Sequence, residues 1–199
     1  SPVKSLATLP MALSIVGIAI FAIFAAKVMS IIGRRAGFMF ASVVSSLSSL
    51  LAAYSIINES FILFNLSCFL LGAGVAFSHQ YRFAAVETVK KDMAPKAISI
   101  ILLAGIGSAF IGPNVANITK GIIAEHLYAG SYIALAALTL TSTVFLLFYE
   151  DGHKPNRVNK KIKRSYLELI SQPRFLQALV ASAFAYAVMS FLMTATPIS

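Results

Sequence analysis

Long uncharged runs, each followed by a short polar segment, recur along the whole chain. The charged residues separate six uncharged windows, at residues 5–26, 36–58, 60–81, 97–119, 126–149 and 175–199. Every window is near the length that a helix needs to cross a bilayer, since about 20 apolar residues span its hydrocarbon core. The windows lack the strict alternation of transmembrane β-strands. The pattern therefore predicts an all-α, polytopic membrane protein with six transmembrane helices.

Composition supports a membrane protein and argues against a soluble domain. Hydrophobic residues make up 58% of the chain and charged residues only 12%, and the mean hydropathy is +0.84. A soluble domain of this size is less apolar. The net charge of +9 is also found in nucleic-acid-binding proteins, but the unbroken apolar windows leave no soluble core that could carry such a face. We expect a lipid bilayer as the surroundings and no nucleic-acid partner.

Lysine and arginine lie almost entirely on one side of the predicted membrane. Of the 16 basic residues, only Lys4 and Lys120 lie outside the segments 27–35, 82–96 and 154–174. Because basic loops remain in the cytoplasm, we expect a multi-pass protein of the inner (cytoplasmic) membrane with these three segments inside. The window 5–26 then runs from outside to inside. This direction predicts at least one further helix before residue 1.

The sequence offers no cluster of residues for catalysis or metal binding. Cys68 is the only cysteine, and His126 and His153 have no partner at ligand spacing. A phosphate-binding loop of the G-x-x-x-x-G-K type is absent. None of the windows pairs two acids or places a nucleophile beside a base. We therefore expect no enzyme activity, no cofactor and no metal site.

Small and polar side chains form stripes within two windows. Serines from Ser42 to Ser49 favour helix packing with hydroxyls bonded one turn back, and a polar pathway is the alternative. Small residues recur every fourth position from Ala104 to Ala116, which predicts one close-packing face. Gly112-Pro113 interrupts that window and predicts a kink. Broken helices line cavities in transporters, although prolines are also common in other membrane helices.

The stretch 150–174 is the longest polar segment. Within it, Val158, Ile162, Tyr166 and Leu169 recur at helical spacing, with lysines largely on the other sides. This pattern favours a basic amphipathic helix on the cytoplasmic leaflet, and a solvated linker is the alternative.

The order and spacing of these features resemble the major facilitator superfamily, and two motifs carry the resemblance. In that family the loop between helices two and three reads G-x-x-x-D-R-x-G-R-R. Residues 26–35 keep its last three positions and depart at three others, and the retained residues are Gly33, Arg34 and Arg35. The fifth family helix often carries G-x-x-x-G-P, typical of antiporters. The matching residues here are Gly107, Ser108, Gly112 and Pro113, with Ser108 at the first glycine position and Gly107 beside it.

The resemblance implies a chain that covers helices two to seven of a twelve-helix fold. Residues 1–149 then hold helices two to six of the N-terminal half. Residues 150–174 form the cytoplasmic inter-domain loop, and residues 175–199 form the first, truncated helix of the C-terminal half. The missing helices of the same transporter are therefore expected partners.

The function implied by the resemblance is secondary active transport of a small solute by alternating access. We expect proton-coupled efflux by antiport, with protons and a small-molecule substrate as partners. A non-transporting membrane sensor or assembly partner of the same fold is the alternative. The expected cavity-lining residues are Asn65, Cys68, Gly72, Asn114, Asn117, Met189, Met193, Thr194 and Thr196.

Two charged residues are candidates for a gate on the cytoplasmic side. Arg82 is one, and a boundary charge that reaches the lipid headgroups is its alternative. Glu87 is the other, and it is expected to pair with Arg34 or Arg35, since the loop motif lacks its own acidic residue. No window contains Asp or Glu, so a proton carrier within this chain would be His79 or Glu87.

Overall fold

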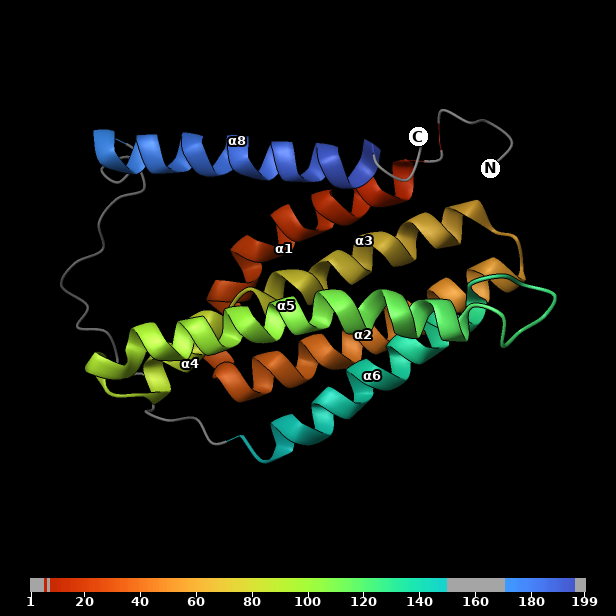
Figure 1. Cartoon of the computed structure of the whole chain (residues 1–199), viewed down its shortest axis with the longest axis horizontal. Helices are drawn as coiled ribbons and strands as arrows, with labels where there is room; N and C mark the ends of the chain where they lie inside the picture. Colours follow the sequence, from red (N-terminus) through yellow and green to blue (C-terminus); the bar gives the residue numbers. More distant parts are fainter. Residues whose placement is uncertain (1–5, 7, 150–170, 196–199) are drawn as a thin grey trace. The chain divides into compact units, whose positions relative to one another are not determined.

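The computed structural model describes residues 6, 8–149 and 171–195, and its secondary structure there is helical (Figure 1). The chain divides into two compact units, residues 1–155 and 156–199. The first unit contains the long helices α1 (Leu9–Ile32), α2 (Arg34–Ile57), α3 (Phe61–Ser78), α5 (Ala94–Thr119) and α6 (Ala129–Leu147). The short helices α4 (Tyr81–Thr88) and η2 (Lys91–Met93) connect α3 to α5. The second unit contains α8 (Pro173–Ala195).

Five stretches of the described residues are long and apolar enough to cross a membrane. They are Leu9–Ile32, Arg34–Ile57, Phe61–Thr88, Ala94–Thr119 and Ala129–Leu147. Each coincides with one of the first five predicted windows, so the all-α class and the positions of these helices are confirmed. The sixth window gives α8, a helix of 23 residues.

The stretch Phe61–Thr88 contains a break that the sequence pattern did not predict. Helix α3 ends at Ser78, and α4 begins at Tyr81 after a turn at His79 and Gln80. Arg82 therefore belongs to a separate helix of 8 residues. Polar side chains begin at this point, which is consistent with a membrane boundary where water can bond the free backbone groups.

Helices α1 and α3 cross at close range in the first unit. A Cβ atom at Gly17 would collide with the carbonyl oxygen of Phe69, and one at Gly72 would collide with the carbonyl oxygen of Ser14. The two backbones can meet here only because both positions are glycine. Helix α2 packs against α3 and α6, while α5 contacts α4 and α6 but has no residue buried by the described part of the chain.

The serines of α2 hold this helix against its neighbours, as the packing interpretation predicted. Ser45 and Ser49 donate hydrogen bonds to carbonyls one turn back, each at 2.8 Å. Ser42 instead donates to the carbonyl of Thr139, and Ser46 donates at 3.2 Å to the carbonyl of Ala136. The difference from the prediction is that part of the stripe bonds across to α6.

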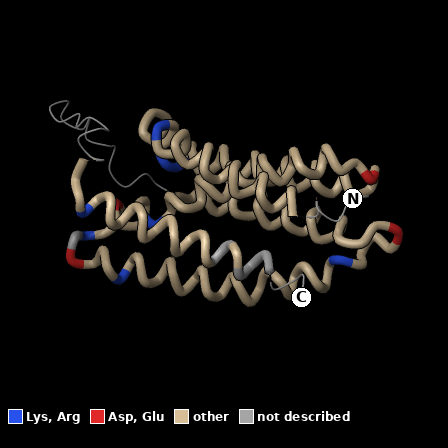
Figure 2. The backbone as a smooth tube through the Cα atoms, turned by 90° about the horizontal axis from the view of Figure 1, so that it is seen from above, with Lys and Arg blue, Asp and Glu red and all other residues tan. Residues whose placement is uncertain are grey.

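Charged residues lie at the helix ends, and the long middle sections are uncharged (Figure 2). We call the end of the first unit where α1 and α6 end and α2 begins the basic end. It carries Lys27, Arg34, Arg35, Arg82, Lys90 and Lys96. The opposite end carries Glu59, Lys120 and Glu125.

Candidate functional site

At the basic end, the turn between α1 and α2 places an arginine against an acid on α4. Gly33 is the single residue between the two helices, and its φ of 89° lies in the region that favours glycine. Arg34 follows and donates two hydrogen bonds to Glu87, from Nε at 2.6 Å and from Nη2 at 2.5 Å. This fork geometry is the strong form of an arginine–carboxylate pair. The expected pairing of Glu87 with the basic loop is confirmed, with Arg34 as its partner.

Arg35 connects the same turn to α6. Its Nη2 donates a hydrogen bond to the backbone carbonyl of Leu147, the last residue of α6. A cation is favoured there because the carbonyls at a helix C-terminus are unsatisfied and carry partial negative charge. Beside it, the rings of Phe38 and Tyr81 stack with centroids 4.2 Å apart. The motif residues therefore fasten α4 and α6 to the start of α2.

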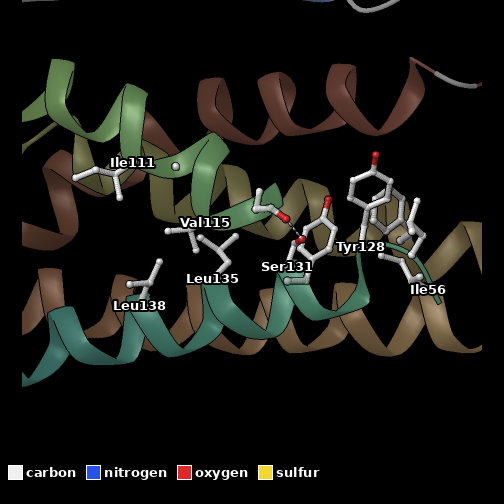
Figure 3. Close-up of a pocket in the computed structure, with 12 residues that line it drawn as sticks. Ile56, Ile111, Val115, Tyr128, Ser131, Leu135 and Leu138 are labelled. Atoms are coloured by element: carbon white, nitrogen blue, oxygen red, sulfur yellow. Dashed lines mark hydrogen bonds between the residues drawn. The ribbon is translucent and has the colours of Figure 1, made fainter. Parts of the chain in front are cut away.

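A wide apolar groove lies between α5 and α6 (Figure 3). Its volume is about 560 Å³, and Ile111 and Val115 of α5 face Leu135 and Leu138 of α6 across it. The remaining lining residues are Ile56, Phe64, Gly112, Ala116, Leu127, Tyr128, Ser131 and Tyr132. We call this space the α5–α6 groove.

The α5–α6 groove offers few free polar groups. The Ser131 hydroxyl already donates to the carbonyl of Ala116 at 2.8 Å, the bond drawn in Figure 3. It also accepts a bond of 3.4 Å from Thr119. The hydroxyls of Tyr128 and Tyr132 are the other side-chain polar groups of the lining. A surface of this kind suits an apolar partner better than a strongly polar solute.

A second groove of about 450 Å³ lies between α1, α3 and α6. Its lining consists of Pro10, Met11, Ser14, Phe64, Cys68, Leu71, Tyr132 and Leu135. We call it the α1–α3 groove. The rings of Phe64 and Tyr132 line both grooves and meet edge to face at 5.7 Å. This aromatic pair therefore separates the two grooves together with Leu135, which also lines both.

The predicted cavity residues of α3 occupy different surroundings. Cys68 is buried and lines the α1–α3 groove. Asn65 is 7% exposed, and its amide nitrogen donates to the carbonyl of Phe61 at 2.7 Å. Its Oδ1 has no hydrogen-bond partner among the described residues. Gly72 is pressed against the backbone of α1 and forms the helix crossing.

The predicted residues of α5 lie on a helix that continues through Pro113. Asn114 donates to the carbonyl of Phe110 at 2.7 Å, and Asn117 accepts from Lys120 at 3.3 Å, so both amides bond within the local helix. Ser108 likewise donates to the carbonyl of Gly105. No other described residue approaches within 4 Å of the place a Cβ would take at Gly107 or Gly112. From Ala104 to Gly112, the small-residue face of α5 is thus exposed in the part of the chain that the structure describes.

The predicted residues of the last window are described only in part. Met189, Met193 and Thr194 lie on α8, but their side chains are outside the described residues, and Thr196 is outside them altogether. The proposed amphipathic helix at 158–169 also lies outside the described residues. Within the described part of the chain, no group of three His, Cys, Asp or Glu residues could hold a metal ion.

Tyr128 and Tyr132 were missed by the sequence analysis. They are four residues apart, a spacing that places them on one side of a helix. Two polar aromatic residues near the start of the window 126–149 were the available signal. Their closeness to Phe64, far away in the sequence, carries no such signal.

Comparison with known proteins places this arrangement in a family. The model described as Major Facilitator Superfamily matches residues 3–199. The chain is 32% identical over 197 residues to the riboflavin transporter RfnT of Brucella anthropi. The matched residues make up 98% of this chain and 50% of RfnT.

Two relatives from Bacillus subtilis also match, and both are called uncharacterized MFS-type transporters. YddS is 27% identical over 150 residues, which are 73% of this chain and 34% of YddS. YdeG is 29% identical over 144 residues, which are 70% of this chain and 33% of YdeG. The chain spans half or less of the length of these curated relatives. No solved structure matches it.

Proposed function

The chain belongs to the Major Facilitator Superfamily, and from this premise we propose that the complete protein carries a small solute across a membrane by alternating access. The observation that carries the proposal is the similarity to a protein named as a riboflavin transporter, which extends over 98% of this chain. A match of this extent includes all five long helices of the first unit and α8. Riboflavin, or a planar aromatic solute of similar size, is the substrate class that we propose to test first.

We further propose export in exchange for protons as the transport mode. Its support is the Gly112-Pro113 sequence in α5, which keeps part of a motif typical of antiporters. The spans in the described residues contain no Asp or Glu apart from Glu87 near the end of Phe61–Thr88. The proton carrier would therefore be Glu87, His79 or a residue of the complete protein beyond this chain.

Reconstituted vesicles provide the test. The complete protein is placed in liposomes, riboflavin is enclosed, and its fluorescence is followed with and without an imposed proton gradient. Protein-dependent flux that accelerates with the gradient in the antiport direction is expected, and empty liposomes are the control. Flux that ignores the gradient would contradict proton exchange, whereas absence of flux for riboflavin and related aromatic solutes would contradict the transport proposal and favour a non-transporting member of the fold.

We propose that other helices of the complete transporter cover the α5–α6 groove and the face of α5. Ala104, Ser108 and Gly112 repeat at four-residue intervals, and such a stripe normally packs against a neighbouring helix. The groove is apolar, and the Ser131 hydroxyl already donates to α5. A membrane helix fits these properties, since its own polar backbone groups are satisfied internally.

Replacing Pro113 with alanine is expected to lower coupled transport more than it lowers the amount of folded protein. Proline lacks the N–H that would bond one turn back, so alanine restores a hydrogen bond and favours a straighter α5. Transport and expression of the complete protein are compared in one preparation. Pro95→Ala is the matched control because Pro95 lies in the first turn of the same helix, where proline removes no helical bond. Unchanged transport would contradict a role for Pro113 in the transport cycle.

Asn65→Leu is expected to weaken substrate affinity by up to about tenfold, the effect of one lost hydrogen bond. The Oδ1 of Asn65 has no hydrogen-bond partner among the described residues and lies one turn before Cys68 in α3, and we propose that a substrate donor reaches it during transport. Stability should change little, because the substitution also removes a buried unsatisfied group. Ser67→Ala is the control, since Ser67 is fully buried and its hydroxyl donates to the carbonyl of Phe64, one turn back in the same helix. Equal effects on the apparent KM in both variants would contradict the proposal.

A further inference from the structure

A small crevice between α2, α3, α4 and α6 differs from both grooves in its chemistry. Its volume is about 60 Å³, and it shares no lining residue with the larger spaces. Its side-chain oxygens come from Ser42, Ser45, Ser78, Tyr81, Thr139 and Ser142. We call it the hydroxyl crevice. Six oxygen-bearing side chains surround this small space, whereas mostly apolar residues line the α5–α6 groove and the α1–α3 groove.

Most hydroxyls of the crevice already donate a hydrogen bond to a backbone carbonyl. Ser45 donates to the carbonyl of Ala41 at 2.8 Å, and Ser78 donates to that of Gly74 at 2.9 Å. Thr139 donates to the carbonyls of its own helix as well. A hydroxyl has one hydrogen and two acceptor lone pairs, so each of these groups retains acceptor capacity. The crevice therefore presents mainly acceptors.

One hydroxyl connects the crevice to α6. Ser42 donates to the carbonyl of Thr139 and accepts a bond of 2.7 Å from Thr143. Its oxygen also lies 3.0 Å from that of Ser142. Linked polar groups stabilise a helix bundle when each of them has its hydrogen-bond partners. They are unfavourable in a membrane when acceptor lone pairs have no donor.

The shape of the crevice follows from a glycine and two aromatic walls. A Cβ at Gly74 would overlap the Ser45 hydroxyl, so only glycine allows that serine to lie against α3. Phe38 and Phe77 line the same space and are 2% and 4% exposed. Both rings are therefore largely shielded from bulk solvent, and water in the crevice would lie next to them.

We propose that the hydroxyl crevice binds ordered water, which joins α2, α3 and α6 through hydrogen bonds. A cavity needs about 10–15 Å³ of water-probe volume to hold one water, which in turn needs two to four polar partners, so the crevice has room for at least one. Water supplies the donors that the serine and threonine lone pairs require. A solute of the size of riboflavin does not fit. The residues that line the crevice include no carboxylate to favour a metal cation.

Radiolytic footprinting of the complete protein in lipid nanodiscs tests this proposal independently of the substrate. Hydroxyl radicals formed from bound water modify side chains next to it, and mass spectrometry locates the modification. We expect Phe38 and Phe77 to be modified despite their burial. After brief mixing with ¹⁸O-labelled water, their products should retain ¹⁶O, whereas the exposed ring of Phe83 should acquire ¹⁸O. Unmodified Phe38 and Phe77, or immediate ¹⁸O labelling of both, would overturn the proposal.

Variants locate the water within the crevice. Ser142→Val fills part of the space and is expected to lower modification of Phe77 several-fold. Thr141→Val is the matched control, since Thr141 bonds a carbonyl of its own helix and does not line the crevice. Ser45→Ala removes an acceptor without adding volume and should act in the same direction if the valine variant does not fold. Equal modification in all variants, or modification suppressed by sodium relative to choline, would overturn bound water as the occupant.

Discussion

Gly72→Val is expected to leave little of the complete protein in a folded, monodisperse state. A Cβ at Gly72 would collide with the carbonyl oxygen of Ser14 and lie 2.9 Å from the nitrogen of Ile18. Both atoms belong to the backbone of α1, so no side chain can rotate out of the way. Inserting methyl groups into a tight contact costs about 1–3 kcal/mol, and more when the backbone must move. The α1–α3 crossing would have to open.

Thermal unfolding in detergent, followed by size-exclusion chromatography, measures this effect. Leu66→Val is the matched control, because it introduces the same residue on the same helix at a position that is 47% exposed. Gly72→Ala should show an intermediate loss, since it adds only the first carbon. A monodisperse Gly72→Val protein with the unfolding temperature of the control would show that the backbones do not meet at this point. It would also restore Gly72 as a position that could face a cavity.

The sequence was sufficient for the membrane helices because their signal is local. A run without charges must be long enough to span the bilayer, and that length can be counted in windows such as 36–58. The break between α3 and α4 was not predictable in the same way. Residues 79–82 are polar, but polarity at a membrane boundary fits both a continued helix and a new one. The outcome depends on tertiary contacts such as the stacking of Tyr81 on Phe38.

The candidate site was predictable where charge decides the contact. Glu87 is the acid that the basic turn lacks, and its position at the same predicted membrane face made Arg34 or Arg35 its expected partner. The bond from Arg35 to the carbonyl of Leu147 could not be predicted, since a backbone carbonyl has no residue identity. Likewise, a glycine such as Gly72 permits both a cavity and a close crossing, and only the position of α1 distinguishes them.

Reversing either charge of the Arg34–Glu87 pair is expected to lower transport about tenfold, and reversing both should restore most of it. The side chains are 22% and 56% exposed, so the pair contributes about 1 kcal/mol or less to stability. The amount of folded protein should therefore change little in Glu87→Arg or Arg34→Glu. A tenfold change in transport corresponds to a shift of about 1.4 kcal/mol between the two access states, which requires the pair to differ between them.

The double variant distinguishes a specific pair from general electrostatics. Arg34→Glu combined with Glu87→Arg keeps the net charge and re-forms an ion pair in the opposite sense. Lys90→Glu is the control for loss of basic charge. It changes the charge at the basic end but breaks no ion pair seen among the described residues. Transport and folded yield are measured for each protein. If the double variant transports no better than the single variants, opposite charge alone is not sufficient for transport. The two hydrogen bonds from Arg34 to Glu87, or a contact with another residue, are then required. If the single variants transport normally, the Arg34–Glu87 pair does not change during the transport cycle and serves only to position α4.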